Sequence, residues 1–393
     1  MVESAFIDVE FSQRSKFRQS ICGDVFISRR IKEEGRILSV LSDGLGSGVK
    51  ASVLANLTAS MALTFASTTS NTRSWAQSIM ASLPVCEVRK LSYSTFTLID
   101  LDEHGLLHFI EYGNPPLILL RGQEQVPVER SEIHLEDVEG ERSISYGQCT
   151  LHIGDRILCM SDGISQSGMG RGSMPFGWTA EAAAETACSV IQQQPDISSR
   201  RLAHALLNQA IANDGGLPRD DSTCAVVHFR VPRQLLIATG PPFLPQRDQE
   251  LARAVQNFPG KKVICGGTTA TIISRLLHRP ITVDLTSPDS GLPPSAQMKG
   301  IDLITEGALT LANVIKLLES DCPRDQLPEN PAGEILKLIM ASDIIHFIVG
   351  TRINEAHQDP FTPQELDLRR NIVQRIIALL ESRHLDTTTI KYL

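Results

Sequence analysis

The sequence predicts an α+β domain followed by an α/β domain. Short strands joined by hairpin turns fill most of the first domain, and two helical stretches interrupt them. After "RVPRQ" the pattern changes to strand, Gly/Pro turn and helix in alternation. At 393 residues the chain is also longer than one compact core usually is. We therefore expect domains at residues 1–233 and 234–393.

The expected strands of the first domain are short and follow one another closely. Residues 5–11 alternate apolar and polar, as a half-buried strand does. In "FTLIDLDEHGLLHFIEYG", residues 102–105 supply the turn of a hairpin. The other strand candidates are "RILSVLSD", "PPLILLRG", "ILCMSDG" and "CAVVHFRV". Hairpin-connected strands imply largely antiparallel sheets with helices covering them.

Two stretches of the first domain lack strand alternation and are expected to be helical. Residues 48–67 are rich in Ala and Leu. Residues 179–214 predict two helices broken at Pro195, with Asp196 or Ser198 as the second N-cap.

The second domain repeats a strand–turn–helix pattern, which indicates parallel βαβ units and a mostly parallel sheet. The segments concerned are residues 235–243, 261–277, 281–285, 300–319 and 341–351.

Composition excludes several classes of partner and location. Lys and Arg total 37 against 45 Asp and Glu, a net charge of −8 without a basic cluster, so we expect no nucleic-acid partner. No basic leader, no run of about 18 apolar residues and no CxxC pair occurs. We therefore expect a cytoplasmic protein with reduced cysteines and no membrane partner.

Aspartates stand at strand ends in four separate motifs of the first domain: Asp24, Asp43, Asp162, and the pair Asp220 and Asp221. Carboxylates packed together repel one another, and hard divalent cations such as Mg²⁺ and Mn²⁺ remove that repulsion. A single Asp-Gly is an ordinary turn signal. Two copies preceded by Ser, beside two further acidic motifs, favour a metal site.

The succession "GDVF", "LSDGLGSGVKAS", "YGNPPLILLRG", "IGDRILCMSDGIS" and "RDDSTCAVV" resembles the metal-dependent PPM (type 2C) serine/threonine phosphatases. It is most similar to their bacterial stage II sporulation protein E-like branch, over residues 5–230 and in family order. The resemblance implies a four-layer αββα sandwich of two antiparallel sheets, with two Mn²⁺ or Mg²⁺ ions at one edge.

The resemblance also implies roles for individual residues. Asp43 would bridge the two ions, and Gly44 would offer its carbonyl to one of them. The other ligands implied are Asp24, Asp162 and Asp220. Asp221 would bind less directly, by orienting Asp220 or a water, or would simply cap the turn.

The implied reaction is attack of a metal-activated water on the phosphorus of a phosphoserine or phosphothreonine. Eukaryotic members carry a phosphate-binding arginine near the first acidic motif, and this sequence gives no match for it. By analogy with the branch, the substrate would be a phosphorylated bacterial regulatory protein, such as an anti-sigma-factor antagonist. In the first helix, Ala51, Ala55 and Ala59 would form either a switch or homodimer surface or plain core packing.

Two other functions stay open. The chain could be a catalytically weak phosphatase fold that acts as a signalling scaffold. It could instead be an enzyme whose main ligand is a phosphorylated small molecule bound by the C-terminal domain.

The C-terminal domain resembles no family, and we expect a regulatory or ligand-binding role for it. Its best site candidate is "VICGGTTATIISRLL", in which Gly266, Gly267, Thr268 and Thr269 stand where a strand runs into a helix. Free N–H groups and hydroxyls at a helix start suit a small anionic ligand. The alternative is a tight turn with Thr268 or Thr269 as N-cap.

Overall fold

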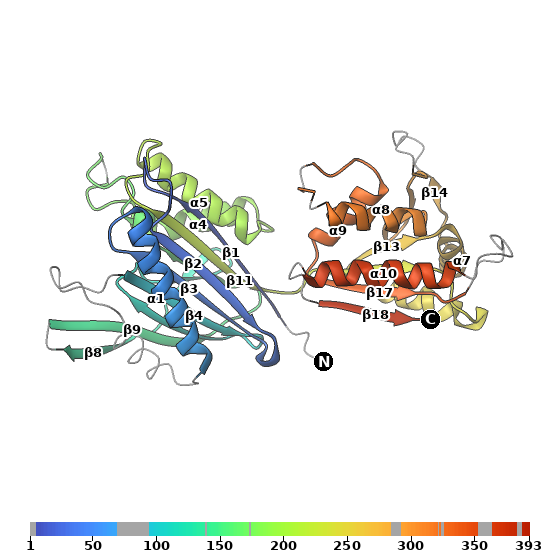
Figure 1. Ribbon diagram of the computed structural model, residues 1–393, viewed down its shortest axis with the longest axis horizontal. Helices are drawn as coiled ribbons and strands as arrows, with labels where there is room; N and C mark the ends of the chain where they lie inside the picture. The colour runs from blue at the N-terminus through green and yellow to red at the C-terminus, as the bar shows by residue number, and fades with distance from the viewer. Residues whose placement is uncertain are drawn as a thin grey trace. The chain divides into compact units, whose positions relative to one another are not determined.

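The computed structural model describes residues 5–68, 94–137, 140–172, 174–283, 292–320, 322–323, 326–352, 364–382 and 387–393. The chain divides into two compact units, Met1–Val231 and Pro232–Leu393 (Figure 1).

The first unit contains two sheets, both antiparallel throughout. The β1 sheet has the order β1 (Phe6–Arg14), β11 (Ser222–Arg230), β10 (Arg156–Met160), β6 (Ile118–Arg121) and β7 (Glu124–Val126). The β3 sheet has the order β2 (Asp24–Ile31), β3 (Arg36–Gly44), β4 (Ser94–Asp102), β5 (Leu106–Tyr112), β9 (Gly140–Thr150) and β8 (Ser131–Asp137). Its helices are α1 (Gly48–Thr68), α3 (Asp162–Ser165), α4 (Ala180–Gln193) and α5 (Ser199–Asn213), with a 3₁₀ turn at Lys32–Glu34.

Three apolar clusters hold these layers together. One lies between the sheets and takes residues from both, among them Phe109 and Ile157. A second joins the β3 sheet to α1 and includes Leu63 and Leu98. A third joins the β1 sheet to α4 and α5 and includes Leu158. The first unit is therefore a four-layer αββα sandwich (Figure 1), and the predicted fold class is confirmed.

Helix α1 belongs to the core of this sandwich. Ala51, Ala55 and Ala59 are at most 1% exposed and pack toward the β3 sheet, so they form core packing rather than a free switch or dimer surface. In the part of the chain that is described, Gly48–Ser67 is the helix long and apolar enough to cross a membrane by length and composition. Core helices of soluble proteins pass the same test.

One predicted helix cap and one predicted turn of the first unit are confirmed, whereas one predicted strand end is wrong. Ser198 is the N-cap of α5 and accepts a hydrogen bond from the Arg201 N–H at 3.3 Å. Asp102 accepts from the N–H of Leu106 at 2.8 Å and so stabilises the β4–β5 hairpin. The prediction that Asp162 closes a strand is wrong, because β10 ends at Met160 and Asp162 begins helix α3.

The second unit is built on one mixed sheet. Its order is β14 (Thr282–Val283), β15 (Ala296–Met298), β16 (Ile301–Thr305), β13 (Lys261–Cys265), β12 (Gln234–Thr239), β17 (Ile344–Val349) and β18 (Thr387–Tyr392). The five strands from β16 to β18 run parallel, and β14 and β15 add an antiparallel edge. The predicted mostly parallel sheet is confirmed.

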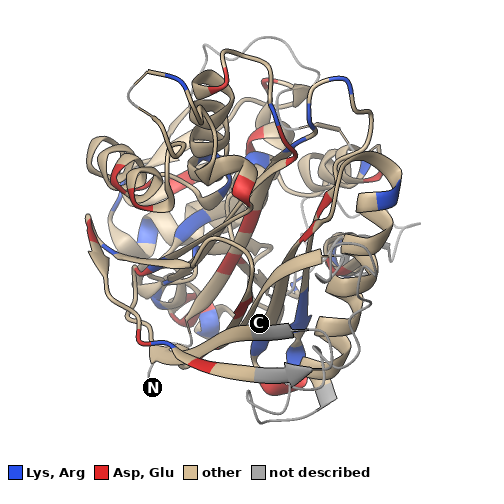
Figure 2. Ribbon diagram, turned by 90° about the vertical axis from the view of Figure 1, so that its left-hand side faces the viewer, with Lys and Arg blue, Asp and Glu red and all other residues tan. Residues whose placement is uncertain are grey.

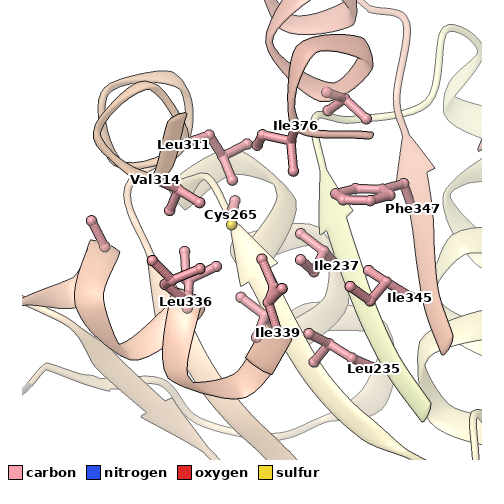
Figure 3. Packing of buried hydrophobic residues seen from close by; sticks show 14 of the residues in the cluster. Leu235, Ile237, Cys265, Leu311, Val314, Leu336, Ile339, Ile345, Phe347 and Ile376 are labelled. Atoms are coloured by element: carbon pink, nitrogen blue, oxygen red, sulfur yellow. The ribbon is translucent and has the colours of Figure 1, made fainter. Parts of the chain in front are cut away.

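Helices cover both faces of this sheet. They are α6 (Asp248–Asn257), α7 (Gly267–Leu277), α8 (Ala308–Glu319), α9 (Pro331–Met340) and α10 (Gln364–Ser382), with a 3₁₀ turn at Pro245–Arg247. On one face, Leu311, Leu336 and Ile376 from α8, α9 and α10 pack over Ile237 and Phe347 of β12 and β17 (Figure 3). Residues of α6 and α7 pack on the other face.

Acidic and basic residues are spread over many elements (Figure 2), and the described cysteines form no disulfides. In the view of Figure 2, acidic and basic residues both occur on many elements. Every cysteine that the structure describes is free, whereas Cys86 lies outside the described residues.

Candidate functional site

Strand pairing brings the predicted aspartates of the first unit together. Asp24 and Asp43 lie opposite each other on the antiparallel strands β2 and β3. Strands β10 and β11 are also antiparallel neighbours, so the residues after β10 and those before β11 lie at one edge of the β1 sheet. Asp162 follows β10 there, and Asp220 and Asp221 precede β11.

Asp24 connects the two sheets. It is 1% exposed, and its Oδ2 accepts hydrogen bonds from the Ser161 hydroxyl at 2.7 Å and the Thr223 hydroxyl at 2.8 Å. Its Oδ1 is buried with no partner among the described residues. Burial, and to a smaller extent the charges of Asp221 and Asp162, raise the pKa of Asp24 to about 7, although its two hydrogen bonds act in the opposite direction.

Asp43 and Asp162 lie close enough for each carboxyl group to influence the pKa of the other. Burial raises the pKa of Asp43, and the neighbouring charges of Asp24, Asp162 and Asp220 raise it further. The pKa of Asp162 is raised by burial first and by Asp220 second. Like charges this close keep a proton unless a cation replaces it. A cation bound among these carboxyl groups would therefore stabilise their ionised forms.

Asp220 and Asp221 have different surroundings. Asp221 is 3% exposed; its Oδ1 accepts from the Lys16 backbone N–H at 2.9 Å, and its Oδ2 is buried without a partner among the described residues. Asp220 is about half exposed, and its Oδ1 lies 3.6 Å from the Lys16 ammonium. Asp221 thus holds the segment around Lys16 in place while one of its oxygens remains available.

This donor set fits divalent cations. Two buried carboxylate oxygens lack a hydrogen-bond donor among the described residues, and burial together with the neighbouring carboxylates raises the pKa values of three carboxyl groups. Among the described residues, no group of three or more His, Cys, Asp and Glu side chains is arranged so that it could by itself hold a metal ion. Mg²⁺ usually keeps several waters and binds through one or two carboxylates, so a shared, partly hydrated arrangement suits this cluster.

The glycines of the two Ser-Asp-Gly motifs are required by backbone packing. A Cβ on Gly44 would overlap the backbone oxygen of Ala51 at the start of α1, and a Cβ on Gly163 would overlap the backbone oxygen of Asp221. Each glycine therefore lets a second segment approach the aspartate that precedes it.

Gly163→Ala is expected to destabilise the first unit by about 1–3 kcal/mol, because the new methyl group must displace the segment that carries Asp221. Denaturant unfolding of the two variants and the wild type measures this. Gly267→Ala is the matched control, since a Cβ there meets no atom within 4 Å. Equal stability of the two variants would contradict the packing argument.

A cavity of about 640 Å³ opens beside the acidic cluster. Asp43, Asp162 and Asp220 line it, together with Tyr112 and other residues of the β3 sheet. Of the described residues that line it, Lys16 is the basic one. The sequence could not single out Lys16 because "RSKFRQS" offers several neighbouring cations, and only the backbone bond to Asp221 fixes which one faces the site.

The predicted anion motif belongs to the second unit, whereas the five aspartates belong to the first. Gly266 is the N-cap of α7, with a positive φ of 121°, and Gly267 is the first residue of the helix. Thr268 and Thr269 lie in its first turn, so the expectation that either of them is the N-cap is wrong.

The family model of Stage II sporulation protein E (SpoIIE) matches residues 33–230. A comparison with curated proteins gives no match.

The chain is similar to many solved structures, among them the three that follow. One is the PP2C phosphatase domain of SpoIIE from Bacillus subtilis with a fragment of its regulatory domain, which is 19% identical to this chain with a TM-score of 0.48. The alignment covers 58% of this chain and 64% of that chain, so this chain spans less than two thirds of the length of that relative. The RsbU and RsbW domains of a Mycobacterium tuberculosis protein are 18% identical over 65% of this chain and 70% of theirs, with a TM-score of 0.46. RsbX in complex with magnesium is 16% identical over 57% of this chain and 95% of its own, with a TM-score of 0.38.

The SpoIIE match extends over half of the 393 residues and includes four of the five aspartates, Asp43, Asp162, Asp220 and Asp221. The chain therefore belongs to the stage II sporulation protein E family.

Proposed function

We propose that this protein is a metal-dependent protein serine/threonine phosphatase that acts on a phosphorylated bacterial regulatory protein. The observation that carries the proposal is the convergence of five aspartates from two sheets beside a cavity of about 640 Å³. The family and the fold support a protein phosphatase.

The chain's own residues would hold two Mn²⁺ or Mg²⁺ ions. The ligands that we assign are Asp24 through Oδ1, Asp43, the Gly44 carbonyl, Asp162, Asp220, and Asp221 through Oδ2. When bound, such ions lower the pKa of water and neutralise the charge of a phosphoryl group.

The surrounding groups position these ligands. The hydroxyls of Ser161 and Thr223 hold one oxygen of Asp24 and so direct the other into the cluster. The Lys16 backbone N–H holds Oδ1 of Asp221, and Oδ2 of Asp221 lies beside Gly23, the residue before Asp24. The cavity admits the phosphorylated side chain from the solvent side, where Lys16 and Asp220 are both partly exposed.

We assign the Lys16 ammonium to binding the incoming phosphate, because it lines the cavity next to Asp220 and Asp162. Lys16→Met is expected to raise KM for a phosphothreonine peptide about tenfold and to change kcat less, since an exposed charge-assisted contact lies at the weak end of about 1.5–3 kcal/mol. Steady-state kinetics measure this, with Lys16→Arg as the control that keeps the charge. An unchanged KM in Lys16→Met would contradict the assignment.

Two alternatives predict different results in one assay. Full-length protein is incubated with Mn²⁺ and a phosphoserine or phosphothreonine peptide, and phosphate release is measured. The phosphatase proposal expects release. A signalling scaffold binds the peptide without releasing phosphate, and an enzyme for a small phosphorylated molecule leaves the peptide intact but hydrolyses or binds that molecule.

The identity of the substrate protein and the cellular location are further parts of this proposal. A phosphorylated regulatory protein, such as an anti-sigma-factor antagonist in the bacterial cytoplasm, is the substrate that we propose by analogy.

A further inference from the structure

Two helices begin side by side at the carboxyl edge of the second unit's sheet. Strands β13 and β16 are parallel neighbours, and each runs through a glycine into a helix, Gly266 into α7 and Gly307 into α8. The two glycines are close together, since a Cβ on Gly307 would lie 3.5 Å from the Gly266 Cα. The unit therefore contains two comparable helix N-termini, which both attract negative charge.

The N-terminus of α8 already has an anion supplied by the chain. Oε2 of Glu306 accepts hydrogen bonds from the N–H groups of Leu309 at 3.0 Å and Thr310 at 3.3 Å. A carboxylate in this position satisfies N–H groups that have no partner within the helix.

The N-terminus of α7 lacks such a group. No side chain caps it, and within the described residues no acceptor is bonded to the N–H groups of Gly267, Thr268 and Thr269. Gly267 and Thr268 are exposed, and a Cβ on Gly267 would meet no atom within 4 Å. The side of Gly267 on which a Cβ would lie is therefore open.

Thr269 adds an independent observation. It is 1% exposed, and its Oγ1 is buried with no hydrogen-bond partner among the described residues. This oxygen lies 3.5 Å from the position that a Cβ on Gly266 would take, so it points back toward the N-cap. A buried hydroxyl without a partner costs free energy, and a ligand at the N-cap would remove that cost.

We propose that the start of α7 binds the phosphate group of a small ligand, either inorganic phosphate or a phosphate monoester. The first turn of α7 offers three N–H groups without an acceptor and, beside Gly266, one hydroxyl without a partner among the described residues. Their number suits a tetrahedral oxyanion with several acceptor oxygens better than a single carboxylate oxygen. Glu306 is held by its bonds to α8 and does not occupy this place.

The test uses the metal-free full chain in EDTA, so that the aspartate cluster does not bind the added anion through metals. Hydrogen–deuterium exchange of the peptide that contains residues 266–270 is followed while inorganic phosphate is added. Phosphate is expected to slow exchange at the start of α7. Sulfate, which has the same shape, is expected to act similarly, and acetate more weakly.

Two variants provide a matched comparison. Thr269→Val removes the hydroxyl at α7 and is expected to weaken phosphate protection about tenfold. Thr310→Val removes the corresponding buried, unpartnered hydroxyl at α8, whose N–H groups Glu306 already occupies, and is expected to leave protection unchanged. Thr268→Glu, which places a carboxylate where a helix start favours one, is expected to abolish the phosphate effect while α7 stays folded.

Absence of protection in the wild type at about 10 mM phosphate would overturn the proposal. So would an equal loss in Thr269→Val and Thr310→Val, or full phosphate protection in Thr268→Glu.

Discussion

Asp43→Asn is expected to lower kcat for a phosphothreonine peptide by at least about a hundredfold. Substitution of residues that only support a metal ligand commonly costs 10–100-fold, and Asp43 stands at the centre of the cluster, in contact with Asp162 and opposite Asp24. The amide has nearly the same shape as the carboxyl group, so the strand pairing of β3 should survive.

The measurement is steady-state hydrolysis with saturating Mn²⁺. Glu124→Gln is the control, because Glu124 is an exposed carboxylate on β7, outside the cavity lining. It should retain wild-type kcat. An Asp43→Asn enzyme with kcat within a few-fold of the control would mean that this carboxylate does not take part in the reaction.

The metal-free protein is expected to lose stability as pH rises from about 4 to 8, and divalent metal should restore it. Burial raises the folded-state pKa of Asp24 from an ordinary 3.8 to about 7, so over this range the folded state retains protons that the unfolded state has released. Unfolding therefore becomes easier as pH rises, by about 1.4 kcal/mol per pH unit for each proton retained. Asp43 contributes in the same direction.

Thermal unfolding in EDTA at pH 5, 6.5 and 8, with and without Mn²⁺ in place of EDTA, measures this effect. Asp43→Asn should flatten the pH dependence and be more stable than the wild type at pH 8 without metal, because it removes one of the repelling carboxyls. Glu124→Gln should follow the wild type. A metal-free wild type whose midpoint rises steadily with pH would refute the electrostatic account.

Fold class and the members of the acidic cluster were predictable from the sequence because their signals are local. Strand alternation, the hairpin at Asp102 and the cap at Ser198 each depend on a few neighbouring residues. The order of the aspartate motifs supplied the rest through resemblance to a family, and strand pairing then brings Asp24 opposite Asp43.

Other features depend on contacts between distant segments and could not be predicted. Lys16 faces the cavity because its backbone bonds to Asp221, 205 residues away. The requirement for Gly163 comes from the backbone of Asp221, which adjoins it only in the folded chain. Asp162 begins a helix directly after Ser161, the N-cap residue, which is held by hydrogen bonds to Asp24 and Thr223 on other strands. The difference between the α7 and α8 N-termini depends on Glu306, whose cap is visible only in three dimensions.

The proposed function requires that the converging aspartates bind divalent cations. Calorimetric titration of the metal-stripped full chain with Mn²⁺, run in parallel on wild type, Asp43→Asn and Glu124→Gln, measures this binding. We expect two Mn²⁺ per chain for the wild type and for Glu124→Gln, and loss of at least one site in Asp43→Asn. A wild type that takes up no Mn²⁺, or an Asp43→Asn isotherm identical to that of the wild type, would contradict the proposal.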